Sequence, residues 1–153
     1  MSRSRRRGYS LVELVVVVTI ILVLTAMIVP VARFNWTRMK EMELKEALRN
    51  MRTAIDDYKR LSDQGLIPVE VGTEGYPKEL EDLVKGMDLG LAKEVKVKFL
   101  RRIPKDPLTG KDEWGIRGSH QDPDEDMWDG SNVFDVYSKA EGKALDGSLY
   151  KEW

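Results

Sequence analysis

The chain has 153 residues, of which 25 are Lys or Arg, 26 are Asp or Glu and none is Cys, giving a net charge of −1. This balance does not indicate a nucleic-acid-binding protein, because such proteins carry a basic patch. The lack of Cys excludes a lipoprotein anchor and leaves no disulfide to stabilise an extracytoplasmic domain, so a metal ion is the alternative to look for.

The N-terminal region joins a basic cluster to a long apolar run. Arg5–Arg7 precede the sequence Gly8-Tyr9-Ser10-Leu11-Val12-Glu13, and no charged residue then occurs before Arg33. At about 1.5 Å per residue, this run nearly spans a bilayer core of about 30 Å. A cleaved secretory signal has a shorter apolar core of about 7 to 15 residues, so we expect a retained transmembrane helix.

The basic residues favour an N-terminus in the cytoplasm. Four arginines precede the span, and three basic residues follow it: Arg33, Arg38 and Lys40. By the positive-inside rule, this difference places the rest of the chain across the membrane.

Glu13 stands near the start of the apolar run. An ionised carboxylate there costs about 2.5 to 3.5 kcal/mol on membrane-insertion scales. The sequence therefore predicts a partner for it.

The helix is predicted to run from about Leu11 to Ser62. An apolar stripe recurs every three or four residues, which is typical of a helix packed on a core: Leu44, Leu48, Met51, Ile55 and Tyr58. Gly65 is well placed just past the helix end. Pro30 lacks an N–H and its ring clashes with the carbonyl of Ala26, so the helix either kinks or locally melts there.

The remaining segments predict a small α+β domain. A short helix is expected over Tyr76–Val84, with Pro77 in its first turn. Strands are expected over Trp114–Arg117 and Val133–Ser138, the latter rich in β-branched and aromatic residues. Pro104–Gly110 has turn chemistry, and residues 119–130 form an acidic loop.

The N-terminal motif resembles the leader of type IV pilins and pseudopilins. This resemblance implies that a membrane-embedded prepilin peptidase cuts between Gly8 and Tyr9 and that Tyr9, where Phe is usual, becomes N-methylated. Glu13, the fifth residue counted from Tyr9, matches the family's glutamate. Pro30 matches the proline at which family helices unwind in filaments, although a simple kink is the alternative.

Glu13 then has three possible states. It could be protonated in the membrane interface, pair with the amine of its own Tyr9, or pair with the amine of a neighbouring subunit. In the third case assembly offsets the cost of the buried charge and sets the axial register of the subunits.

The C-terminal half is similar to the major pseudopilins of type II secretion systems (the general secretion pathway protein G family). Three segments carry this resemblance: Phe99–Pro107, Trp114-Gly115 and Phe134–Ser138. In those proteins a calcium ion holds the loop after the last strand.

Two places are candidates for calcium. Asp122, Asp124 and Asp126 alternate as in an EF-hand, but Met127 and Val133 replace the glycine and glutamate of that loop, which favours a solvated acidic loop. The second place is the segment 138–148. There the resemblance and the hard oxygen ligands suggest Asp146 first, then Glu141 and Ser138, although a loop without metal is the alternative.

The sequence contains no arrangement typical of catalysis, and the single histidine, His120, argues against zinc and for a surface loop. We therefore expect a structural protein and not an enzyme. A single-pass membrane enzyme or sensor is the rival of another class. The expected parts are a leader (1–8), a transmembrane and polymerisation helix (9–32), an amphipathic helix (33–65) and a periplasmic domain (66–153).

The resemblance implies a pseudopilus subunit of the bacterial inner membrane that drives export of folded proteins. Its partners would be other copies of itself, minor pseudopilins, the prepilin peptidase, an assembly platform with its cytoplasmic ATPase, and an outer-membrane secretin. A type IV pilin for adhesion, motility or DNA uptake, or a minor initiating pseudopilin, is the alternative.

Overall fold

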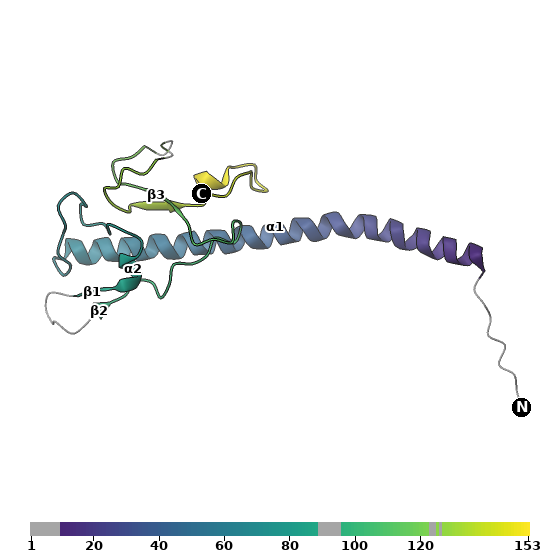
Figure 1. Ribbon diagram of the computed structural model, residues 1–153, viewed down its shortest axis with the longest axis horizontal. Helices are drawn as coiled ribbons and strands as arrows, with labels where there is room; N and C mark the ends of the chain where they lie inside the picture. Colours follow the sequence, from purple (N-terminus) through teal and green to yellow (C-terminus); the bar gives the residue numbers. More distant parts are fainter. Residues whose placement is uncertain (1–9, 89–95, 123–124, 126) are drawn as a thin grey trace, which may run out of the picture. The chain divides into compact units, whose positions relative to one another are not determined.

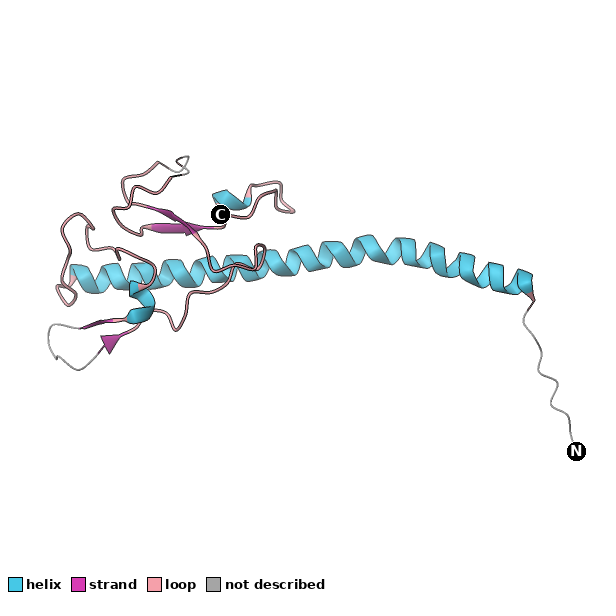
Figure 2. Ribbon diagram, in the orientation of Figure 1, coloured by secondary structure: helices cyan, strands magenta, loops and turns pink. Residues whose placement is uncertain are grey.

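The computed structural model describes residues 10–88, 96–122, 125 and 127–153. Figures 1 and 2 show one long helix followed by short elements, in the order α1 (Leu11–Asp63), α2 (Asp82–Lys85), β1 (Met87–Asp88), β2 (Lys96–Val97), β3 (Gly115–Arg117), β4 (Asp135–Tyr137) and the 3₁₀ helix η1 (Tyr150–Glu152). The strands pair antiparallel. This layout confirms the predicted α+β class. Two compact units divide at Arg38 and Met39, and α1 contributes to both.

The first unit is an apolar helix whose side chains face outward. Within α1 the most apolar window has a mean hydropathy of 3.1 and none of it is buried, so this helix is long and apolar enough to cross a membrane. The hydroxyls of Thr19 and Thr25 donate to carbonyls four residues back, at 2.8 and 2.7 Å. Such bonds satisfy polar groups that hydrocarbon would leave unpaired.

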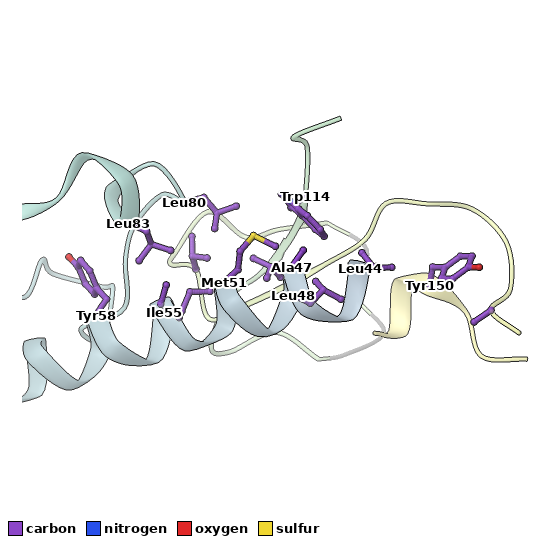
Figure 3. Packing of buried hydrophobic residues seen from close by; sticks show 14 of the residues in the cluster. Leu44, Ala47, Leu48, Met51, Ile55, Tyr58, Leu80, Leu83, Trp114 and Tyr150 are labelled. Carbon is purple, nitrogen blue, oxygen red and sulfur yellow. The ribbon is translucent and has the colours of Figure 1, made fainter. Parts of the chain in front are cut away.

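The second unit is built on the predicted apolar stripe of α1. Leu44, Met51 and Ile55 have no exposed surface, and Leu48 and Tyr58 are also buried. Figure 3 shows these side chains on one face of α1, with Leu80, Leu83 and Trp114 against them. The stripe is therefore the core of the domain, as its spacing predicted.

The C-terminus of α1 follows the prediction closely. Gly65 has a φ of 72°, a conformation that strains residues with a Cβ. Its N–H donates to the carbonyl of Ser62, and the N–H of Leu66 donates to that of Leu61, at 2.9 and 3.0 Å. These two bonds form a Schellman motif, which satisfies the last carbonyls of the helix.

The strands form two separate pairs, which flank the second-unit part of α1 in Figure 1. Strands β3 and β4 lie within the two predicted strand segments, with Ile116 opposite Val136. Strands β1 and β2 pair antiparallel through Met87 and Val97, a pairing that the sequence did not predict. Both pairs are too short to stand alone and depend on the core beneath them.

The predicted helix over Tyr76–Val84 is shorter and later than expected, because only Asp82–Lys85 is α-helical. The carbonyl of Pro77 accepts the N–H of Val133 at 2.8 Å in place of a helical bond. Asp82 also bonds the N–H of Glu79 at 3.0 Å, which favours turns over a regular helix before it. Tertiary pairing therefore overrides the local helical tendency.

The predicted turn at Pro104–Gly110 is organised by a fully buried carboxylate, Asp106. Its Oδ1 accepts the N–H groups of Leu108 and Thr109, at 2.7 and 3.3 Å. Its Oδ2 accepts the hydroxyl of Ser138 at 2.6 Å. Asp106 thus joins the turn to the residue that follows β4.

Candidate functional site

The predicted cleavage site, Gly8 and Tyr9, lies outside the described residues, so its processing stays a prediction. The described chain begins at Ser10, whose carbonyl accepts the N–H of Leu14 at 3.0 Å. Residue 10 is therefore immediately before the first turn of α1.

Glu13 lies in that first turn with an exposed side chain. The positive end of the helix dipole favours an anion at this position. Ser10 and Glu13 also have the spacing of a capping box, in which each side chain serves the backbone of the other residue. Neither bond of such a box is found between Ser10 and Glu13, both of which the structure describes, so this local role, which we did not predict from the sequence, rests on the spacing and the helix dipole.

Pro30 lies inside α1, and the helix continues through it from Leu11 to Asp63. The local melting considered from the sequence is therefore not a feature of this single chain. Unwinding of the helix at Pro30 on assembly stays a prediction.

The three residues predicted to bind calcium lie in different environments. Ser138 is fully buried, and its hydroxyl donates to Asp106 and accepts the N–H of Ala140 at 3.0 Å. Glu141 is exposed. Asp146 is exposed as well, and its Oδ1 accepts the N–H and the hydroxyl of Ser148, at 3.0 and 2.6 Å.

Electrostatics at Asp146 favour its charged form. The hydroxyl of Ser148, followed by the N–H of the same residue, lowers the pKa of Asp146, and the charge of Lys45 lowers it further. The carboxylate is therefore ionised and already partnered.

Calcium takes about six to eight oxygen ligands. Across 10–88, 96–122, 125 and 127–153, no three His, Cys, Asp or Glu side chains gather into a group that could hold a metal ion. The structure thus does not bring Glu141 and Asp146 into an acidic cluster, and the hydroxyl of Ser138 is committed elsewhere. Calcium binding in this loop stays a prediction.

The acidic loop is described only in part, because Asp124 and Asp126 lie outside the described residues. Asp122 is exposed. His120 is exposed too, as predicted, and its Nε2 lies 2.8 Å from Oε1 of Glu74. The EF-hand comparison stays untested.

A buried carboxylate on α1 holds the C-terminal loop, and the sequence reasoning missed it. Glu41 is only 8% exposed, and its Oε1 accepts the N–H of Leu145 at 2.8 Å and the hydroxyl of Tyr150 at 3.0 Å. Figure 3 shows Tyr150 beyond the Leu44 end of the core stripe. Burial raises the pKa of Tyr150, and the hydrogen bond to Glu41 raises it further.

Arg52 forms a second link between α1 and the C-terminal segment. Its Nε lies 2.6 Å from Oδ1 of Asp135 in β4. Its Nη2 donates to the carbonyls of Val136 and Trp153, at 3.1 and 2.9 Å. One guanidinium therefore joins the helix, the strand and the last turn.

Lys45 is the third residue of α1, after Glu41 and Arg52, that contacts the C-terminal segment. Its ammonium lies 4.0 Å from the ring centroid of Trp153. Trp153 in turn packs edge-on against Tyr150, with ring centroids 5.3 Å apart. The sequence did carry one signal for Glu41. Glu41 precedes Leu44 by three residues, so it extends the apolar stripe with a charged residue.

A scan of known protein families matches residues 3–29 to the prokaryotic N-terminal methylation motif. This range includes Gly8, Tyr9 and Glu13. The match supports the type IV pilin-like superfamily and indicates a protein of a pilus or a secretion system. Together with the apolar helix, it is consistent with a single-pass membrane-anchored protein. Neither the comparison with curated proteins nor that with solved structures gave a match.

Proposed function

We propose that the protein is a structural subunit of the pseudopilus of a type II secretion system. The observation that carries this proposal is the methylation motif running into an exposed apolar helix with a single carboxylate, Glu13, in its first turn. Such a helix polymerises by packing against copies of itself. The narrower assignment to a major pseudopilin rests on the sequence resemblance of the C-terminal half.

In this proposal the N-terminus lies in the cytoplasm and the domain in the periplasm of a bacterial inner membrane. The prepilin peptidase cuts between Gly8 and Tyr9 and Tyr9 is methylated. The chain then assembles with minor pseudopilins on an inner-membrane platform driven by a cytoplasmic ATPase. The growing filament pushes folded proteins toward an outer-membrane secretin, and the subunit itself catalyses no reaction.

A type IV pilin is the second candidate, because the matched motif is common to pili and secretion pseudopili. A minor initiating subunit shares the motif as well. Co-expression with each type of assembly platform separates these cases. We expect filaments with the secretion platform, and filaments with a pilus platform alone would favour the second candidate.

Processing is tested by intact-mass measurement of the chain purified from cells that contain the peptidase. We expect a chain that begins at Tyr9 and carries one additional methyl group. Gly8→Val is the control that blocks cleavage. A wild-type chain that still begins at Met1 in those cells contradicts the proposal.

Assembly is tested with Glu13→Ala. If assembly pairs Glu13 with a neighbouring amine, the wild type gains about 2.5 to 3.5 kcal/mol on assembly, because the pairing offsets the cost of the charge in the membrane. The variant has no such gain, so we expect its assembly constant to be roughly 100-fold lower. The measurement is the yield of sheared filaments at matched membrane levels, with Thr19→Ala as control. Undiminished assembly of Glu13→Ala would leave the capping role as the better account.

A further inference from the structure

We infer that the C-terminal loop, residues 141–149, is closed onto α1 by the carboxylate of Glu41 and does not require calcium. The inference concerns the fold of the second unit, and it stands whichever filament the subunit builds.

Glu41 holds the loop at two points. The N–H of Leu145 lies in the middle of the loop and the hydroxyl of Tyr150 lies just after it, and both donate to the same oxygen, Oε1. One oxygen atom of α1 therefore ties two separate points of the C-terminal segment to the helix. Because Glu41 is buried, loss of its carboxylate would leave these donors without a protein partner.

The loop also closes on itself. Lys143 and Leu149 form an antiparallel bridge, the N–H of Ala144 donates to the carbonyl of Ser148 at 2.8 Å, and the N–H of Gly147 donates to the carbonyl of Ala144 at 2.9 Å. The indole of Trp153 donates to the hydroxyl of Ser148 at 2.7 Å. The turn is thus formed by its own backbone and by the segment that follows.

These bonds engage several of the oxygen atoms that a cation would use. The carbonyls of Ala144 and Ser148, the hydroxyls of Ser138 and Ser148, and Oδ1 of Asp146 each accept or donate a hydrogen bond within the protein. A calcium ion bound by these atoms would compete with the hydrogen bonds that they already form. The donor set therefore fits a hydrogen-bonded turn better than a metal site.

The charges around the loop also argue against a calcium ion there. The charge of Lys45 lowers the pKa of Asp146, and its ammonium lies over the ring of Trp153, so a positive charge already acts on the first predicted ligand. Like charges repel, and a divalent ion beside Lys45 would bind more weakly than in an all-acidic loop.

The test uses the full chain in detergent micelles. Amide hydrogen exchange is followed in a peptide that covers residues 141–150, with added calcium and with a chelator, and the melting temperature is recorded in parallel. For the wild type we expect the same exchange and the same melting temperature in both conditions. For Glu41→Ala we expect exchange in this peptide at least tenfold faster, with Glu46→Ala, an exposed glutamate of the same helix, as the matched control.

Two further variants cover the case in which Glu41→Ala fails to fold. Tyr150→Phe removes only the hydroxyl, and we expect faster exchange near Leu145 in a chain that remains folded. Glu141→Ala removes a predicted metal ligand, and we expect no change in exchange or melting temperature.

The inference is overturned if calcium protects the peptide from exchange or raises the melting temperature of the wild type. It is equally overturned if Tyr150→Phe and Glu41→Ala, when folded, exchange like the wild type. If calcium slows exchange or raises the melting temperature of the wild type but not of Glu141→Ala, the loop binds calcium through Glu141.

Discussion

The residue with the most demanding environment is Asp106. It is fully buried, and its two oxygens serve three donors from the 106–111 turn and from Ser138. One side chain therefore adds three bonds to the backbone bonds that Asp106 forms with Lys111 and Gly110.

We predict that Asp106→Ala lowers the free energy of unfolding by about 3 kcal/mol, because the buried hydroxyl of Ser138 and two N–H groups of the turn lose their acceptor. Denaturant unfolding of the full chain in detergent gives this value. Asp112→Ala, at an exposed position of the same region, should stay within about 0.5 kcal/mol of the wild type. Equal effects of the two substitutions would contradict the structural role of Asp106.

The raised pKa values of two tyrosines predict how the stability of the domain changes at alkaline pH. Burial, followed by the charges of Asp82 and Glu70, raises the pKa of Tyr58, and burial together with Glu41 raises the pKa of Tyr150. Both phenols bind their protons more tightly in the folded state. Their contribution to stability is therefore present below about pH 10 and is lost as the pH rises beyond it.

The expected result is a fall in unfolding midpoint between about pH 9 and about pH 11 that is smaller in Tyr150→Phe than in the wild type. Absorbance of tyrosinate, recorded for folded and unfolded chains, identifies the late-titrating groups. Identical titration of the folded and unfolded chains would refute the raised pKa values.

At the scale of elements, sequence patterns correctly predicted the features that depend on residues close together in the chain. The stripe from Leu44 to Tyr58 identified the buried face of α1, and Gly65 identified its end. The strand segments followed from β-branched and aromatic residues. These features depend on neighbours in sequence, so one chain suffices to predict them.

Other features depend on partners far along the chain. The carbonyl of Pro77 pairs with Val133, which shortens α2, and Glu41 pairs with residues more than 100 positions away. No period or motif specifies such a pairing. For the same reason, the sequence could suggest Ser138, Glu141 and Asp146 as candidate ligands but could not predict whether their side chains lie together.

The end of α1 is testable with Gly65, whose φ is 72° and whose missing Cβ would meet no other atom. Gly65→Ala should lower the free energy of unfolding by about 1 kcal/mol, because the cost comes from the backbone conformation alone. Asn tolerates this conformation better, so Gly65→Asn should cost less. Thermal unfolding of the three chains gives the order, and an unchanged Ala variant would argue against the Schellman motif.

At the scale of the whole molecule, the two units differ in how far their apolar side chains are covered. The first exposes an apolar helix that membrane lipid or other helices can cover. Every residue of the hydrophobic core cluster belongs to the second unit, from Leu44 onward. Among the described residues, the core cluster therefore contains none from the apolar span.

This separation predicts that residues 39–153 fold without the span. We expect the shortened chain to be soluble and to unfold cooperatively, with a melting temperature within about 5 °C of the full chain, which corresponds to about 1 kcal/mol. Circular dichroism and sedimentation measure both properties. A shortened chain without a cooperative transition would show that the span stabilises the domain.

The links from Glu41 to Tyr150 and from Arg52 to Trp153 also set the order of events when the chain is made. They close loops of 109 and 101 residues, and contacts so far apart in sequence form late because loop closure must precede them. A nascent chain that has not yet released residues 150–153 leaves Glu41 and Arg52 without these partners. These two links therefore form only after residues 150–153 have been made, and a chain truncated before residue 150 would lack both.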